Sequence, residues 1–223
     1  MSSRALLLVG SARPSGRSTS EALGHYLMAS LESHGVTTTK RFVARSVRDD
    51  RIPALLGALE SADLLVLSTP LYVDALPYLV TRAMERIDAH RARQEIPRPV
   101  RFAAIVNCGF PEAHTCDTAL GLCRSFARHA EMAWAGGLAL GAGAVIDGRL
   151  LESMGRVTRH VRAALDATAE ALAHGQDVPE RAVEWMAHPL IPTRAYTMMT
   201  HLHWVREARR NGVLKKLGDR PFA

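Results

Sequence analysis

Hydroxyl-bearing and basic side chains are concentrated in residues 10–20, directly before an apolar pattern with helical spacing. The segment reads Gly-Ser-Ala-Arg-Pro-Ser-Gly-Arg-Ser-Thr-Ser. The first turn of a helix has backbone N–H groups without intrahelical acceptors at the positive end of the helix dipole, so it binds phosphate readily. Further hydroxyl donors and positive charge come from Ser18, Thr19, Ser20, Arg13 and Arg17. We therefore expect a phosphate site; the alternative is a serine-rich turn in which a serine caps the helix.

Several common signatures are missing from the chain. Residues 10–20 contain neither G-x-x-x-x-G-K-[ST], the ATP-type phosphate loop, nor G-x-G-x-x-G, the usual dinucleotide fingerprint. The three cysteines, at positions 108, 116 and 123, include no C-x-x-C pair and are too few for a disulfide framework. His201 and His203 would point about 200° apart on a helix. We expect no metal site.

The elements that would position the loop follow an alternating pattern. Five segments are predicted as strands, at about residues 6–9, 36–43, 64–67, 102–106 and 133–140. Short apolar runs typical of buried strands mark 6–9, 64–67 and 102–106, threonines at positions 37–39 favour an extended chain in 36–43, and small residues make up 133–140. Helical patterns alternate with them, at about residues 22–31, 53–59, 79–87, 119–127 and 150–174. The alternation predicts an α/β fold, a doubly wound five-stranded parallel sheet with helices on both faces. Ligands of such sheets bind outside the carboxyl ends of the strands, so the loops after the first, third and fourth strands should form the site.

These three loops resemble those of a known family. Residues 10–20, as G-S-x-R-x-x-x-x-S-T-S, resemble the FMN phosphate loop of flavodoxin-like NAD(P)H-dependent FMN reductases. Residues 68–77, Ser-Thr-Pro-Leu-Tyr-Val-Asp-Ala-Leu-Pro, resemble that family's T-P-x-Y-x-x-x-x-P segment, which contacts the flavin ring. Residues 107–112 stand where the family touches the ring again. The resemblance covers about residues 4–175 and implies a flavodoxin-like fold, bound FMN and NAD(P)H as the hydride donor. The FMN-binding residues that it implies are Ser11, Arg13, Ser18, Thr19, Ser20, Pro70, Leu71, Tyr72, Val73, Asp74, Asn107, Cys108, Gly109 and Phe110.

The residue types in these loops suit a flat ring with apolar faces and one polar edge. Tyr72 can form a wall, and residues 71–76 can offer backbone N–H groups because flanking prolines keep the segment non-helical. Asp74 either orients a ring N–H or caps the helix that begins near Pro77. Cys108 either tunes the ring edge or is a small buried thiol. Because a flavin itself carries hydride transfer, we nominate no catalytic residue.

The positive charge of the chain lies mostly at its C-terminal end. The net charge is +6, and residues 194–223 contribute seven basic and two acidic side chains, which leaves the preceding residues close to neutral at +1. We divide the chain into a flavodoxin-like domain at 1–175 and a linker with a basic helical tail at 176–223, with the linker over 176–193 and the helix over about 196–211. The tail is either a solvated basic face or a site for an anionic partner, and its apolar stripe should pack on its own body or on a dimer mate.

Together these features predict an FMN-dependent oxidoreductase that takes hydride from NAD(P)H and passes electrons to a small acceptor such as a flavin or quinone. The alternative is a flavodoxin-like electron carrier or a regulatory binding protein without turnover. We expect a homodimer, no binding to nucleic acid, no membrane span and a cytoplasmic location, because residues 5–9 are too short for a signal-peptide core.

Overall fold

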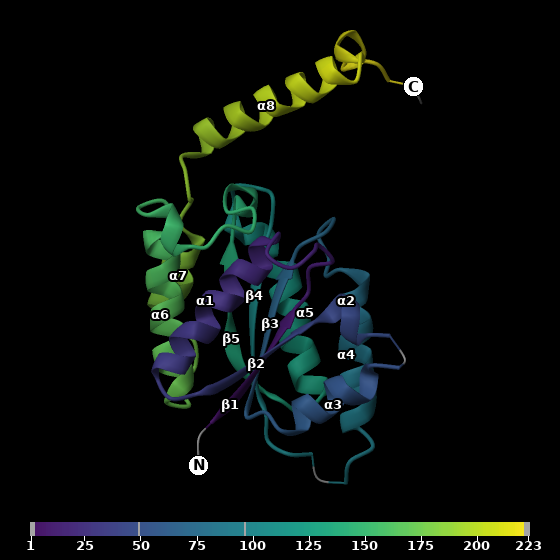
Figure 1. The fold of residues 1–223 in the computed structure, drawn as a ribbon, viewed down its shortest axis with the longest axis vertical. Helices are drawn as coiled ribbons and strands as arrows, with labels where there is room; N and C mark the ends of the chain where they lie inside the picture. Colours follow the sequence, from purple (N-terminus) through teal and green to yellow (C-terminus); the bar gives the residue numbers. More distant parts are fainter. Residues whose placement is uncertain (1–2, 49, 96, 221–223) are drawn as a thin grey trace. The chain divides into compact units, whose positions relative to one another are not determined.

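The apolar runs of the sequence form one parallel sheet, with the strand order β2-β1-β3-β4-β5. The computed structural model describes residues 3–48, 50–95 and 97–220. The strands are β1 (Arg4–Val9), β2 (Thr37–Phe42), β3 (Leu64–Pro70), β4 (Arg101–Asn107) and β5 (Ala133–Leu140). This is the order of flavodoxin-like doubly wound sheets, in which the direction of winding reverses between β1 and β3. The predicted fold class is therefore confirmed (Figure 1).

Two helix layers cover the sheet, one on each face (Figure 1). One layer contains α1 (Thr19–Ser33), α6 (Arg159–Ala173) and α7 (Glu180–Ala187). The other contains α2 (Val43–Ser46), α3 (Ile52–Glu60), α4 (Tyr78–Arg91) and α5 (Asp117–His129). Alternate residues of β1 point into opposite layers: Leu7 packs with α1 and α6, and Leu6 and Leu8 pack with α3 and α4. Strands β1, β3 and β4 are buried on both faces, which is why their sequences are mostly apolar, whereas β2 at the edge of the sheet is polar and largely exposed.

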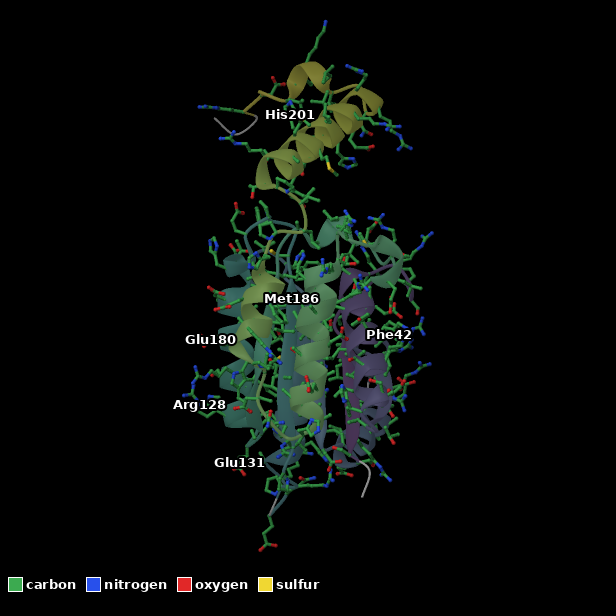
Figure 2. All side chains as sticks on the ribbon, turned by 90° about the vertical axis from the view of Figure 1, so that its left-hand side faces the viewer. Phe42, Arg128, Glu131, Glu180, Met186 and His201 are labelled. Atoms are coloured by element: carbon green, nitrogen blue, oxygen red, sulfur yellow. The ribbon has the colours of Figure 1, made fainter. Side chains whose placement is uncertain are left out.

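The structure corrects the prediction of a linker over residues 176–193. Helix α7 lies in that segment, beside α6 in the layer that faces the viewer in Figure 2, where Glu180 and Met186 mark its two ends. Its Ala182 and Met186 are fully buried in the core. The chain reaches α7 along β5, where the Val178 N–H donates to the Ala135 carbonyl over 2.7 Å. The body of the molecule thus runs to Leu190 and not to residue 175.

A second correction concerns the predicted helix over residues 150–174, because α6 begins only at Arg159. The preceding residues form turns and a short 3-10 helix, η3 (Glu152–Met154). Gly155 follows with a φ of +56°, a left-handed conformation that a continuous right-handed helix excludes. Met154 still packs against the core, as its helical spacing predicts, whereas Val157 is exposed.

Residues Ile191–Ala223 form a second compact unit, here called the tail unit. It contains α8 (Thr193–Arg210) and a short 3-10 helix, η4 (Leu214–Lys216). The predicted stop at Gly212 is confirmed: its φ is +69°, and the Val213 N–H turns back to the Ala208 carbonyl over 2.9 Å. Among the described residues, no helix is both long and apolar enough to cross a bilayer.

Candidate functional site

A cleft opens at the carboxyl ends of β1, β3 and β4, along the upper edge of the sheet in Figure 1. The cleft is open to solvent and has a cavity volume of about 180 Å³. The lining residues are Ser11, Arg13, Ser18, Thr19, Ser20, Pro70, Leu71, Tyr72, Asn107, Cys108, Gly109, Gly143, Ala144 and Asp147. The three loops chosen from the sequence therefore meet at one cleft.

Most of the residues predicted from the sequence lie at this cleft. Eleven of the fourteen predicted residues line the cleft, while Val73, Asp74 and Phe110 do not. The sequence prediction missed Gly143, Ala144 and Asp147, which belong to the loop after β5. A signal was present, because this loop also follows a strand end and reads Gly-Ala-Gly-Ala over residues 141–144. Small residues there let the backbone pass close to its neighbours: a Cβ on Gly141 would stand 2.2 Å from the Pro111 carbonyl oxygen.

The end of the cleft at which the sequence predicts a phosphate is the N-terminus of α1. Ser18 is the N-cap, and its Oγ accepts a hydrogen bond from the Glu21 N–H over 3.1 Å. The N–H groups of Thr19 and Ser20 occupy the first two helical positions, which have no intrahelical acceptor. The helix-capping role and a phosphate site are thus compatible at this loop, because capping uses a lone pair of Ser18 and leaves its hydroxyl proton for a ligand.

The other two hydroxyls of the predicted set are committed to the protein. Thr19 Oγ1 donates to the Gly143 carbonyl over 2.7 Å, and Ser20 Oγ donates to Asn107 Oδ1 over 2.7 Å. Both side chains are buried. Their hydrogen bonds join the start of α1 to the end of β4 and to the loop after β5. Thr19 and Ser20 therefore have backbone N–H groups to offer, but not free hydroxyls.

Glu21 fixes the shape of the loop over residues 10–18 through the hydrogen bonds of its carboxylate. Its carboxylate accepts hydrogen bonds from Ser15 Oγ at 2.9 Å, from the Gly16 N–H at 2.6 Å and from Lys40 Nζ at 2.9 Å. Burial by itself would raise the pKa of Glu21, but the hydrogen bonds from Lys40, Gly16 and Ser15 outweigh it and leave the pKa below its usual value. The loop is thus preorganised around an ionised carboxylate.

An ion pair spans the mouth of the cleft beside this loop. Arg13 Nη1 lies 2.8 Å from Asp147 Oδ1 and also contacts the Arg17 carbonyl at 3.4 Å. The Arg13 and Asp147 side chains are both more than half exposed, so the pair is weak in water and can be exchanged for a ligand anion. Asp147 itself has a φ of +45°. The next residue, Gly148, lies so near the first loop that a Cβ on it would stand 2.8 Å from the Arg17 backbone.

The second loop contains a tight turn with an unusual backbone. Tyr72 and Ala75 exchange both backbone hydrogen bonds, at 2.9 and 3.1 Å, around Val73 and Asp74. These two central residues have φ values of +49° and +57°, the pattern of a type I′ hairpin turn. The turn leaves the ring of Tyr72 half exposed at the cleft and places Val73 in solvent. Of the two alternatives for Asp74, helix capping is wrong, because α4 has Pro77 at its N-cap and no side-chain cap.

Asn107, at the end of β4, connects the three predicted loops. Its Oδ1 accepts from Ser20 of the first loop, and its backbone carbonyl accepts from the Leu71 N–H of the second loop over 2.8 Å. The next residue extends the connection, because the Cys108 carbonyl accepts from the Gly143 N–H over 2.8 Å. Asn107 is buried, so these bonds hold the floor of the cleft away from water.

Comparison with known proteins supports the fold and little beyond it. No family model and no curated protein matches the sequence. Among solved structures, RosB with bound 8-demethyl-8-formylriboflavin-5'-phosphate is 16% identical, with a TM-score of 0.61 over 100% of this chain and 90% of that chain. The chain has a flavodoxin-like fold.

Two further structures with this fold are similar over the body of the molecule. An NAD(P)H:quinone oxidoreductase from Methanothermobacter marburgensis is 12% identical, with a TM-score of 0.56 over 77% of this chain and 96% of that chain. The Trp repressor binding protein from Bacillus subtilis is 10% identical, with a TM-score of 0.56 over 73% of this chain and 96% of that chain. The resemblance stated from the loops is thus matched by structures of the same fold, at identities that show the fold alone.

Proposed function

We propose that this chain is a flavoprotein oxidoreductase that binds FMN in the cleft, takes hydride from NAD(P)H and passes electrons to a small acceptor. The observation that carries the proposal is the meeting of three sequence-predicted loops at one cleft, with a phosphate site at one end and an aromatic ring beside it. The names of similar structures agree: one binds a riboflavin phosphate derivative, and another is an NAD(P)H:quinone oxidoreductase.

The residues present fit FMN at its phosphate end. The Thr19 and Ser20 N–H groups and the Ser18 hydroxyl supply three donors to one anion at a helix N-terminus. Arg13 supplies a charge when it leaves Asp147. One buried hydrogen-bonded network, from Glu21 to Gly16, keeps the loop in the shape that directs those donors outward.

The middle of the cleft fits a flat ring. Tyr72 offers an aromatic face. After β4 the cleft is lined by Cys108 and Gly109, which have no bulky side chains. Gly143 lies beside them, where a Cβ would stand 3.0 Å from Asn107 Nδ2. A flavin bound there would supply the hydride chemistry, and this chain would bind it, orient it and limit its contact with water.

We also propose that the body forms a homodimer. Several large apolar side chains of the body near the cleft loops are exposed, namely Tyr72, Val73, Tyr78 and Phe110. Apolar patches beside a ligand site are frequently covered by a partner. Sedimentation of the purified chain tests this proposal, and a monomer at micromolar concentration would contradict it.

The decisive experiment compares FMN with riboflavin. The full chain is titrated with each by calorimetry, and the visible spectrum is then followed during anaerobic addition of NADPH. We expect FMN to bind about 10–100-fold more tightly than riboflavin, because only FMN has a phosphate for the α1 site. Ser33→Ala, at the exposed far end of α1, is a matched control that should change neither affinity.

Each outcome has a distinct meaning. No binding of FMN at tens of micromolar contradicts the proposal. Equal affinity for FMN and riboflavin contradicts the phosphate site but not the ring site. A bound flavin band that NADPH does not bleach favours the electron carrier over the reductase.

A further inference from the structure

A short series of buried hydrogen bonds crosses the floor of the cleft from β3 to the end of β4. Ser68 Oγ, in β3, donates to the Ser20 carbonyl over 2.6 Å, and Ser20 Oγ donates to Asn107 Oδ1 over 2.7 Å. All three residues are more than nine-tenths buried. Away from water such bonds hold their members firmly, so the orientation of the Asn107 amide is fixed from inside the protein.

This orientation leaves the amide nitrogen of Asn107 for the cleft. Because Oδ1 is turned toward Ser20, Nδ2 points away from it, and among the described residues Nδ2 has no hydrogen-bond acceptor. Nor is Nδ2 fully enclosed: in the described part of the chain, the enclosed side-chain atoms without a partner belong to Arg101 and Arg162. Since Asn107 lines the cleft, its two amide N–H donors are open to a ligand there.

Gly143 keeps this nitrogen uncovered. A Cβ on Gly143 would stand 3.0 Å from Asn107 Nδ2 and 3.1 Å from the Cys108 carbonyl oxygen, both closer than ordinary van der Waals contact. Any other residue at position 143 would therefore crowd the amide. A buried donor without an acceptor costs free energy, which a ligand oxygen that accepts from Nδ2 would recover.

The neighbours of Asn107 indicate which part of a ligand meets this donor. On one side is Ser20, in the first turn of α1 at the end of the cleft that suits a phosphate. On the other side the Leu71 N–H donates to the Asn107 carbonyl over 2.8 Å, next to Tyr72 at the end that suits a ring. Asn107 thus lies between the two ends of the cleft. In FMN and riboflavin the chain attached to the ring is a polyol, whose hydroxyl oxygens accept hydrogen bonds.

We propose that Asn107 is a specificity-determining residue, which donates from Nδ2 to a hydroxyl oxygen of the polyol chain of the flavin. The cleft then selects a ring that carries a hydroxylated chain over the same ring without one. This inference rests on the proposed function, because it takes a flavin as the ligand. It adds a requirement that neither the phosphate site nor the aromatic wall imposes.

Three flavins separate the contributions of phosphate, chain and ring. The full chain is titrated by calorimetry with FMN, with riboflavin, which lacks the phosphate, and with lumiflavin, which has a methyl group in place of the polyol chain. The step from FMN to riboflavin measures the phosphate site, and the step from riboflavin to lumiflavin measures the contacts of the polyol. We expect wild type to bind riboflavin at least about 10-fold more tightly than lumiflavin.

Asn107→Asp tests the donor itself. The substitution keeps an oxygen for the Ser20 hydroxyl and replaces the Nδ2 donor by an acceptor. Riboflavin should bind about 10-fold more weakly or worse, whereas the affinity for lumiflavin should change by less than about 2-fold. Asn211→Asp is the matched control, since it makes the same chemical change at the other asparagine of the chain, in the tail unit, where Nδ2 donates to the Glu207 carbonyl over 2.9 Å. Its affinities should equal those of wild type.

The outcomes distinguish this proposal from the proposed function. A wild-type chain that binds no FMN contradicts the proposed function, and this inference fails with it. If wild type binds FMN but binds riboflavin no more tightly than lumiflavin, only the role of Asn107 is overturned. An unchanged riboflavin affinity in Asn107→Asp, or an equal loss for riboflavin and lumiflavin, also overturns it. The wild-type comparison needs no variant, so it decides the matter even where Asn107→Asp does not fold.

Discussion

Ser18 and Ser20 stand two residues apart, but the structure gives their hydroxyls different partners. Ser18 caps α1 and keeps a proton for a ligand, whereas Ser20 donates to Asn107. We predict that Ser18→Ala weakens FMN binding by about 1.5–3 kcal/mol, the usual value of a hydrogen bond to a charged group. Calorimetry with FMN measures the change.

The same substitution at Ser20 should act mainly on folding. Ser20→Ala leaves the Asn107 amide oxygen without its buried donor, which should lower the free energy of unfolding by about 1–3 kcal/mol. Urea unfolding of both variants separates the effects. If Ser20→Ala reduces FMN affinity more than Ser18→Ala does, the assignment of the free hydroxyl is wrong.

Glu21 makes the stability of the phosphate loop depend on pH. Because its pKa is lower in the folded chain, its stabilising effect is present above the ordinary value of 4.5 and is lost as the pH falls through the lower folded value. We predict that Glu21→Gln lowers the free energy of unfolding by about 1–2 kcal/mol at pH 7, and that the gap from wild type closes below about pH 4. Urea unfolding at a series of pH values measures the gap.

The exposed Glu170 provides the comparison for this pH series, because no hydrogen bond to its carboxylate is seen among the described residues. Glu170→Gln should follow the wild-type curve. A constant gap between wild type and Glu21→Gln across the series would show that the Glu21 carboxylate acts by packing and not by charge.

At the scale of single elements, the turn from Tyr72 to Ala75 stores backbone strain. Val73 is β-branched, has a φ of +49° and is fully exposed, so packing does not compensate for its conformation. Asn and Gly are the residues that type I′ turns prefer at these two positions. We predict that Val73→Asn with Asp74→Gly raises the free energy of unfolding by about 1–2 kcal/mol in urea denaturation.

Val157 is the matched control for that turn, since it is an exposed valine outside the left-handed region. Val157→Asn should not stabilise the chain. If the turn variant is more stable and binds FMN as before, the strained backbone is not needed for FMN binding. If the variant loses FMN binding, the strained conformation of the turn is needed for contact with the ligand.

The strands that were predicted correctly from the sequence were predictable for one physical reason, their burial. Strands β1, β3 and β4 are buried on both faces, so their apolar runs are continuous and bounded, and the rule that ligands bind at the carboxyl ends of strands then led to the cleft. Helix α7 was missed because Pro179, Pro189 and Pro192 surround it and only Ala182 and Met186 show its buried face. The loop after β5 was missed because Gly143 and Ala144 contribute backbone geometry, and because the pairing of Asp147 with Arg13 joins residues far apart in the sequence. The hydrogen-bond acceptors of the Thr19 and Ser20 hydroxyls lie far away in the sequence, so a local sequence pattern does not predict them.

At the scale of the whole molecule, the boundary between the two compact units is also the boundary between a nearly neutral and a basic part of the chain. The body up to Leu190 has a net charge of +1, and the tail unit has +5. We predict that a chain ending at Leu190 folds, binds FMN with unchanged affinity and elutes from a cation-exchange column at much lower salt. Thermal unfolding, calorimetry and the elution profile measure these three properties. Failure of the shortened chain to fold, or a tenfold loss of FMN affinity, would show that the tail unit belongs to the site.

The bonds around Asn107 have a consequence for the way the cleft opens. The Leu71 N–H donates to Asn107, the Cys108 N–H donates to Leu140, and the Gly143 N–H donates to Cys108. Each of these amide hydrogens lies on a bond to or from the end of β4, so movement of that strand end opens all three bonds together. We therefore expect the loops after β3, β4 and β5 to share one opening event, with their amides exchanging with deuterium at a common rate. A ligand that holds any one loop would then slow exchange in all three.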